Sequence, residues 1–192
     1  MNFPSAFGAS LLLAWLAPQA PSPATQTPDF KVQIWGGAAA DFVARMNAYD
    51  ELRHKLEQGL PRLEVTSNPA EILRAEGLLA ARIRVARASA RRGDIFTRSI
   101  RAAFRRALRS ETSGGVCESI RDDNPGEFDY RINGTYPKYQ PLSTVPPGML
   151  AALPSLPPDV YYRFLGRDLV LHDTRANVIL DEIPDAVVCP RR

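Results

Sequence analysis

A chain of 192 residues, 45% of them hydrophobic, is long enough to bury a substantial core, which excludes a protein that is disordered throughout. The formal net charge of +3 is small for this length and excludes a polycation that coats nucleic acid by charge alone. The length predicts one domain, and any binding of anions must be local.

The beginning of the chain has the composition of a secretory signal segment. An uncharged apolar run over residues 6–17 precedes small residues and the polar, proline-rich stretch of residues 18–28. The run is shorter than the roughly 20 residues of a membrane-spanning helix, which makes a permanent anchor the weaker alternative. The lack of Lys or Arg before the run is atypical. We expect residues 1–20 to be a signal segment, residues 21–40 a disordered or extended leader, and residues 41–192 a single exported domain, periplasmic or extracellular.

A first amphipathic helix is predicted from Asp41 onwards. Apolar residues recur there at spacings of three and four, as one helix face requires, until the breakers that begin at Gly59. These apolar positions are Phe42, Met46, Tyr49, Leu52 and Leu56.

The second predicted helix has a well-marked beginning. Asn68 is a good N-cap, Pro69 takes the first helical position, and Glu71 can accept a hydrogen bond from the backbone N–H of the cap. We expect this helix to run to about Arg91 and to stop at Gly93. Its inward face is a stripe of small and branched residues: Ile72, Ala75, Leu79, Ile83, Ala86 and Ala90.

A third helix is predicted between its cap Thr97 and about Arg109. Three helices joined by short turns over residues 41–110 predict a helical bundle. Residues 111–127 are polar and contain glycine and proline, which predicts a loop and the most mobile segment. The apolar side of the third helix comprises Ile100, Ala103, Phe104, Ala107 and Leu108.

The last third of the chain, residues 128–187, is predicted to be rich in β-structure. Residues 128–132 alternate like a half-buried strand, and Asn133 with Gly134 is typical of a type I′ turn. A short helical turn is predicted over residues 149–153. Three further strands form an antiparallel meander, expected over residues 160–165, 168–173 and 178–181 with a turn at 166–167. The predicted fold class is α+β, an N-terminal three-helix bundle followed by a small C-terminal antiparallel meander.

The most distinctive sequence of the second half is YRFLGRDLVL at residues 162–171, and IPDA follows at residues 183–186. Between these two stretches lie Asp173, Ala176, Asn177 and Asp181, and upstream lie GDIF at residues 93–96 and INGTYP at residues 132–137. Together they resemble a group of uncharacterised secreted bacterial proteins over most of the chain after the signal segment. This resemblance implies secretion and brings no activity with it. The final hairpin is also similar, more faintly, to small periplasmic proteins of nickel and cobalt homeostasis, but it lacks clustered metal ligands and implies no metal site.

The two cysteines, Cys117 and Cys189, predict one disulfide in a chain that enters an oxidising compartment. Two separate thiols are the alternative. A disulfide here would close a loop of about 70 residues and stabilise the fold by about 4 kcal/mol. Two cysteines without clustered histidines lack the ligands of a zinc site, so no metal is predicted.

Arginine gives the strongest local charge signal. Between residues 71 and 110, eleven arginines stand against three acidic residues. Those of the second helix spread around its circumference, whereas four in the third helix recur at spacings of three and four and share one face. These four are the predicted contact for an anion or a partner: Arg98, Arg101, Arg105 and Arg109.

Like charges at these spacings repel, so a bound anion would relieve a cost. The functional hypothesis is contact with phosphate, lipid headgroups or an acidic protein. Because no aromatic residues interleave with the arginines, binding of single-stranded nucleic acid is not predicted. The alternatives are an exposed helix face without a partner, or internal pairing with the acidic residues Asp168, Asp173, Asp181, Glu182 and Asp185.

No motif for a nucleophile, a phosphate loop, a dinucleotide or a metalloprotease is present, so no catalytic residue or cofactor is predicted. The leading hypothesis is a non-enzymatic binding or interaction module. His54 follows Asp50 by four residues, which predicts a surface contact on a helix. The alternative is a small secreted hydrolase with a site near His172, although neighbours on a strand point to opposite faces and His172 would not form a dyad with Asp173. The adjacent carboxylates of residues 181 and 182 have no spacing that places both in one cleft.

Overall fold

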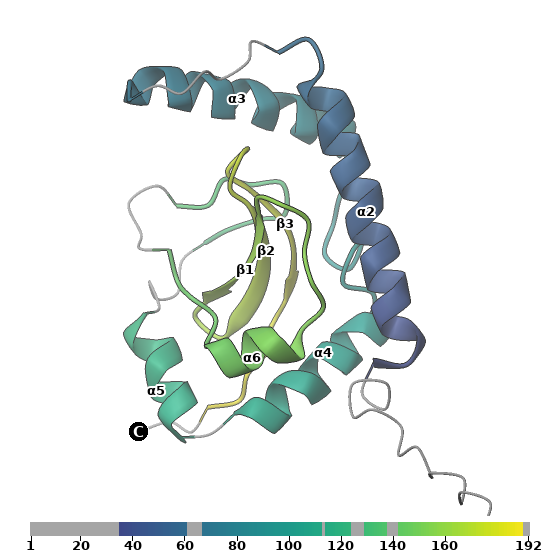
Figure 1. The fold of residues 1–192 in the computed structure, drawn as a ribbon, viewed down its shortest axis with the longest axis vertical. Helices are drawn as coiled ribbons and strands as arrows, with labels where there is room; N and C mark the ends of the chain where they lie inside the picture. The colour runs from purple at the N-terminus through teal and green to yellow at the C-terminus, as the bar shows by residue number, and fades with distance from the viewer. Residues whose placement is uncertain (1–34, 61–66, 113, 124–128, 138–141, 190–192) are drawn as a thin grey trace, which may run out of the picture.

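The computed structural model describes residues 35–60, 67–112, 114–123, 129–137 and 142–189. In these ranges five helices precede a three-stranded antiparallel sheet (Figure 1), so the chain is α+β, as the sequence predicts. The helices are α2 (Gly37–Glu57), α3 (Pro69–Ala86), α4 (Arg98–Glu111), α5 (Gly114–Asp122) and α6 (Pro147–Ala152). The strands are β1 (Val160–Leu165), β2 (Asp168–Asp173) and β3 (Val178–Ile183).

The helix α2 begins four residues before the predicted start at Asp41. Gly36, which precedes it, has a φ of 45°, a conformation that glycine adopts at little cost. Trp35 is buried and packs edge-on against Phe104, with 4.8 Å between ring centroids. The expected leader therefore overlaps the folded domain at its end. Residues 1–34, including the expected signal segment, lie outside the described residues.

The predicted start of α3 is confirmed, and its predicted end is wrong. The Asn68 side chain accepts a hydrogen bond from the Ala70 N–H at 3.0 Å. Glu71 accepts a hydrogen bond from the side-chain amide of Asn68 at 3.1 Å. The helix ends at Ala86, five residues before Arg91, where the backbone of Arg87 leaves the helical conformation and its carbonyl accepts a hydrogen bond from the Asn133 side chain. The guanidinium of Arg87 in turn donates to the Asn133 side chain and to the Leu180 carbonyl.

The helices do not form the predicted three-helix bundle. In Figure 1, α2 runs along one side of the sheet, α3 crosses over one end of it, and α4 lies at the opposite end with α6 in front of it. The reason is that α2 and α4 bury their apolar faces on the sheet as well as on each other. Phe42 of α2 and Phe104 of α4 both lie against Tyr162 of β1, with ring centroids 6.4 and 5.8 Å away.

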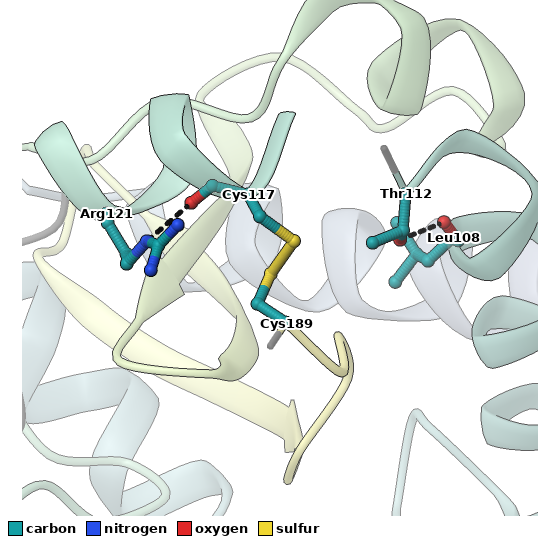
Figure 2. Close-up of a disulfide and its surroundings, with 5 residues drawn as sticks. All are labelled: Leu108, Thr112, Cys117, Arg121 and Cys189. Carbon is teal, nitrogen blue, oxygen red and sulfur yellow. Dashed lines mark hydrogen bonds between the residues drawn. A yellow bond between two sulfur atoms is a disulfide. The ribbon is translucent and has the colours of Figure 1, made fainter. Parts of the chain in front are cut away.

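The loop predicted over residues 111–127 is interrupted by α5. Cys117 and Ile120 are three residues apart on one face of this helix and both are buried. So short an amphipathic pattern is obscured in the sequence by the glycines and polar residues around it. Cys117 is joined to Cys189 by the expected disulfide, with 5.7 Å between the Cα atoms (Figure 2). The crosslink fastens α5 to the last described residues of the chain.

The predicted meander is confirmed. The strands pair in the order β1-β2-β3, with Val160 opposite Asp173 and Leu169 opposite Ile183, and β3 extends two residues beyond the prediction. The turn at residues 166–167 contains Gly166 with a φ of 60°. The short helical turn predicted over residues 149–153 is present as α6, which begins two residues earlier and ends one residue earlier.

The predicted strand over residues 128–132 is not formed in its described part, residues 129–132. Asn133 has a φ of 61°, but Gly134 does not share the positive φ that a type I′ turn requires, so that turn is also wrong. Residues 133–135 instead pair briefly along the free edge of β3. The Asn133 N–H donates to the Ile179 carbonyl at 2.8 Å, the Ile179 N–H donates to the Gly134 carbonyl at 2.9 Å, and Thr135 forms an isolated antiparallel bridge with Val178.

Each face of the sheet has its own core. On one face, side chains of the three strands pack against α2 and α4 around the aromatic group of Trp35, Phe42, Phe96, Phe104 and Tyr162. On the other face, Val170 and Ile179 are covered by Tyr136. Among the helices that the structure describes, none combines the length and apolarity needed to cross a membrane.

Candidate functional site

The position of α4 is fixed by a buried carboxylate on β3. Asp181 is 0% exposed and accepts hydrogen bonds from the backbone N–H groups of Gly93, Ile95 and Phe96 at 2.7 to 3.2 Å. It also accepts from the N–H of Glu182 at 2.8 Å. Gly93, Ile95 and Phe96 belong to the loop that leads into α4, and Thr97 then caps the helix as predicted. Asp181 therefore determines where α4 begins and which way its outer side faces.

The arginine face of α4 consists of Arg98, Arg101, Arg105 and Arg109. Its opposite side is the predicted apolar side, and all five of those residues are buried. Arg105 donates to the carbonyl of Pro184 at 2.6 Å. The guanidinium groups of Arg98, Arg101 and Arg109 make no hydrogen bond or ion pair with another described residue. The helical spacing in the sequence thus predicted a face on which three of four guanidinium groups lack a partner among the described residues.

Three arginines in and just after α3 make hydrogen bonds within the fold. Arg82 donates to the carbonyls of Leu56 and Gln58, and Arg84 donates to the carbonyl of Asn133. Arg87 is partly buried, and this burial lowers the pKa of its guanidinium. These arginines stabilise the fold by bonding backbone oxygens, whereas Arg98, Arg101 and Arg109 of α4 make no such bond with another described residue.

Internal pairing between the arginine face and the C-terminal acidic residues does not occur among the described residues. Asp181 binds backbone N–H groups, Glu182 pairs with Arg92, and Asp185 pairs with Arg167 at 2.7 Å. Asp168 accepts from Tyr130, and Asp173 accepts from Tyr49. The alternative of internal neutralisation of the arginine face is therefore wrong for this part of the chain.

Asp173 belongs to a buried polar cluster between α2 and β2 that the sequence did not reveal. The Tyr49 hydroxyl donates to Asp173 at 2.5 Å, and burial together with this carboxylate raises the pKa of the Tyr49 phenol. Arg53 is 2% exposed and donates to Asp50 at 2.6 Å, while its Nη1 lies 3.7 Å from both Asp173 and Asp159. Tertiary contact alone brings these residues together, and the cluster joins α2 to the end of the sheet.

The two histidines occupy different surroundings. His54 is exposed and its Nδ1 lies 2.8 Å from the Asp50 carbonyl, which agrees with the expected surface contact. His172 is 3% exposed, its Nε2 lies 2.9 Å from the Asn177 Oδ1, and its ring stacks on Tyr136. Asp173 points to the opposite face of the sheet, toward Tyr49. His172 and Asp173 therefore do not form a dyad.

Burial lowers the pKa of His172 from 6.5 to about 4. Between these two pH values the unfolded chain binds more protons at His172 than the folded chain does. The contribution of neutral His172 to the free energy of unfolding is therefore complete above pH 6.5 and is lost as the pH falls to 4.

We expect this residue to account for about 3 kcal/mol of lost stability between pH 6.5 and pH 4. Urea unfolding at pH 7 and pH 4 should show a smaller loss in His172→Phe than in the wild type. His54→Gln is the matched control and should lose as much as the wild type; equal losses in all three proteins would contradict the assignment.

A groove that the sequence did not predict lies between the end of α2, the first turns of α3 and the tips of the meander. Its volume is about 1250 Å³. Apolar lining residues are Leu60, Ile72, Ala75, Leu78 and Leu79, and charged ones are Glu57, Glu71, Arg74, Glu76, Asp159 and Arg175. We call this feature the α3 groove. Sequence reasoning assigned part of its wall to the core.

Within the described ranges, His, Cys, Asp and Glu side chains do not gather in the groups of three or more that hold a metal ion. Comparison with protein-family models, with curated proteins and with solved structures finds no match to this chain. The arginine face and the α3 groove are therefore interpreted from their chemistry alone.

Proposed function

We propose that this protein is an exported, non-enzymatic binding module that rests on an anionic membrane surface of the cell envelope through the arginine face of α4. The observation that carries the proposal is that three guanidinium groups of this face have no partner among the described residues. Guanidinium groups bind the phosphates of lipid headgroups through paired hydrogen bonds. Each arginine near an anionic surface contributes about 1 kcal/mol of attraction.

The form of the face favours a membrane surface over an acidic protein. Protein interfaces are centred on buried apolar and aromatic side chains. None of the large hydrophobic side chains that are exposed in the described part lies on α4. From Arg98 to Arg109 the face extends about 16 Å along a convex helix, which can meet a flat, charged surface along its whole length.

Export is supported by the disulfide, by the apolar run near the start of the sequence and by a resemblance. The disulfide between Cys117 and Cys189 is of the kind that persists in oxidising compartments. The apolar run near the start of the sequence and the resemblance to secreted bacterial proteins agree with it. A hydrolase centred on His172 is not proposed, because His172 is buried against Tyr136 and turned away from Asp173.

The proposal is tested by sedimentation of the protein with vesicles of anionic phospholipid and with vesicles of zwitterionic phospholipid. We expect binding to the anionic vesicles only, weakening as salt rises because exposed charges are screened. Reversing three charges in Arg98→Glu, Arg101→Glu, Arg109→Glu should weaken binding by at least about a hundredfold.

The matched control reverses three arginines away from α4, in Arg74→Glu, Arg121→Glu, Arg131→Glu. Its net charge equals that of the first variant. If the position of the charges on α4 determines binding, the control should bind anionic vesicles about as well as the wild type. Equal loss in both variants would show that net charge alone drives binding and would refute the proposal. Binding to a purified acidic protein but not to anionic vesicles would also refute it, and would assign the face to a protein partner.

A further inference from the structure

The apolar face of α3 that was predicted to pack in the core is only partly buried. Leu79 and Ile83 are buried, whereas Ile72, one residue of the same stripe, is 41% exposed. Four of the nine large hydrophobic side chains that are exposed in the described part lie on this helix: Ile72, Leu73, Leu78 and Val85. Figure 1 shows α3 crossing over the end of the sheet, with α2 beside only one of its ends. The first turns of α3 thus present an apolar face that no described element covers.

This apolar face forms one wall of the α3 groove. Ile72 and Leu78, which is 42% exposed, line the groove together with the half-buried Ala75 between them. Leu73 lies on the same helix and is 49% exposed, but it does not line the groove. The apolar lining is therefore directed into a concave site, and Leu73 offers a comparison outside it.

The charged lining of the groove is predominantly acidic. Glu57 pairs with Arg175 at 2.6 Å, which leaves Glu71 and Glu76 against Arg74. Asp159 shares the single buried guanidinium of Arg53 with Asp50 and Asp173, so its negative charge is only partly offset. Glu76 makes no hydrogen bond or ion pair with another described residue. The groove therefore favours an occupant that carries positive charge.

The carboxylate of Asp159 is held at the mouth of the groove. The backbone carbonyl of Asp159 accepts hydrogen bonds from the N–H and the hydroxyl of Thr174 at 2.8 and 3.1 Å. The buried Arg53 lies 3.7 Å from its carboxylate. Asp159 is nonetheless half exposed, so one acidic group is fixed in place and remains accessible to a ligand.

We propose that the α3 groove binds a basic amphipathic helix of a partner protein. Its volume of about 1250 Å³ exceeds the roughly 300–1,000 Å³ of sites for small molecules. An amphipathic helix places apolar anchors three and four residues apart in such a groove. These anchors contact Ile72, Ala75 and Leu78, while lysine or arginine on the flanks of the partner helix pairs with Glu76 and Asp159. The site is separate from the arginine face and does not depend on the proposed membrane contact.

The test uses fluorescence anisotropy with a labelled 14-residue amphipathic peptide of leucine and lysine. We expect saturable binding of this peptide and no binding of the corresponding peptide of leucine and glutamate. The variant Ile72→Ser, Leu78→Ser should weaken binding by at least about tenfold, because each change removes an apolar contact. The variant Glu76→Gln, Asp159→Asn should weaken binding and flatten its dependence on salt.

The matched control is Leu73→Ser, Val85→Ser, which makes equivalent changes on the same helix outside the groove and should leave binding unchanged. Arg98→Glu, Arg101→Glu, Arg109→Glu should also bind the peptide normally, which separates this proposal from the membrane contact. Equal binding of the leucine–glutamate peptide, or equal loss in the control, would overturn the proposal. So would a dimer in sedimentation velocity that Ile72→Ser, Leu78→Ser dissociates, because the groove would then be occupied by a second copy of the chain.

Discussion

Replacing Asp181 with alanine should lower the free energy of unfolding by about 4 kcal/mol, within the range of about 3–5 kcal/mol for breaking a buried charged interaction. The change removes the acceptor of the backbone N–H groups of Gly93, Ile95 and Phe96, all of which turn toward this carboxylate. No water can replace it cheaply, because Asp181 is fully buried. Urea unfolding of the wild type and the variant measures the difference.

Asp185→Ala is the matched control for this experiment. Asp185 belongs to the same segment and pairs with Arg167, but both side chains of this pair are more than half exposed. Exposed ion pairs contribute at most about 1 kcal/mol, so this variant should unfold close to the wild type. Asp181→Asn should also be strongly destabilised, because its amide would face N–H donors. Similar unfolding free energies for Asp181→Ala and Asp185→Ala would contradict the anchoring role.

Removing the disulfide should have an effect of similar size. Cys117 and Cys189 are 72 residues apart, and release of a loop of this length gives the unfolded chain an entropy equivalent to about 4 kcal/mol. Replacing both cysteines with serine avoids leaving an unpaired thiol. The expected result is a urea midpoint well below that of the oxidised wild type. Changes of pH or salt concentration should not restore the lost stability.

Reduction of the wild-type protein provides the internal control. If the crosslink itself stabilises the fold, the reduced wild type and the double serine variant should unfold at the same denaturant concentration. Protection of α5 from hydrogen exchange should fall in both, because the disulfide fastens this short helix to the C-terminal segment (Figure 2). An unchanged midpoint after complete reduction would contradict this account.

The sequence was sufficient to predict those structural features that depend on residues close together in the chain. Asn68, Pro69 and Thr97 predicted the starts of two helices, because an N-cap bonds N–H groups within the next three residues. Alternation and glycine predicted the three strands and the turn at Gly166. The four arginines of α4 were found in the same way, since helical spacing alone places them on one face.

Features made by distant residues could not be predicted. At the end of α3 the carbonyl of Arg87 accepts from Asn133, 46 residues away, and its guanidinium donates to Leu180, 93 residues away. The bond from Gly93 to Asp181 spans 88 residues, so the sequence showed a carboxylate but not its partners. The α3 groove was missed for a related reason: a periodic apolar stripe is the same in sequence whether Ile72 meets the core or remains exposed.

The most direct test of the account is to determine which face of the protein meets an anionic membrane. Nuclear magnetic resonance spectra recorded with anionic vesicles that carry a paramagnetic headgroup report proximity through the loss of amide signals. We expect the strongest losses at Arg98, Arg101, Ala102, Arg105 and Arg109 and little loss along α3. Uniform losses over the molecule, or losses centred on α3 with α4 unaffected, would contradict it.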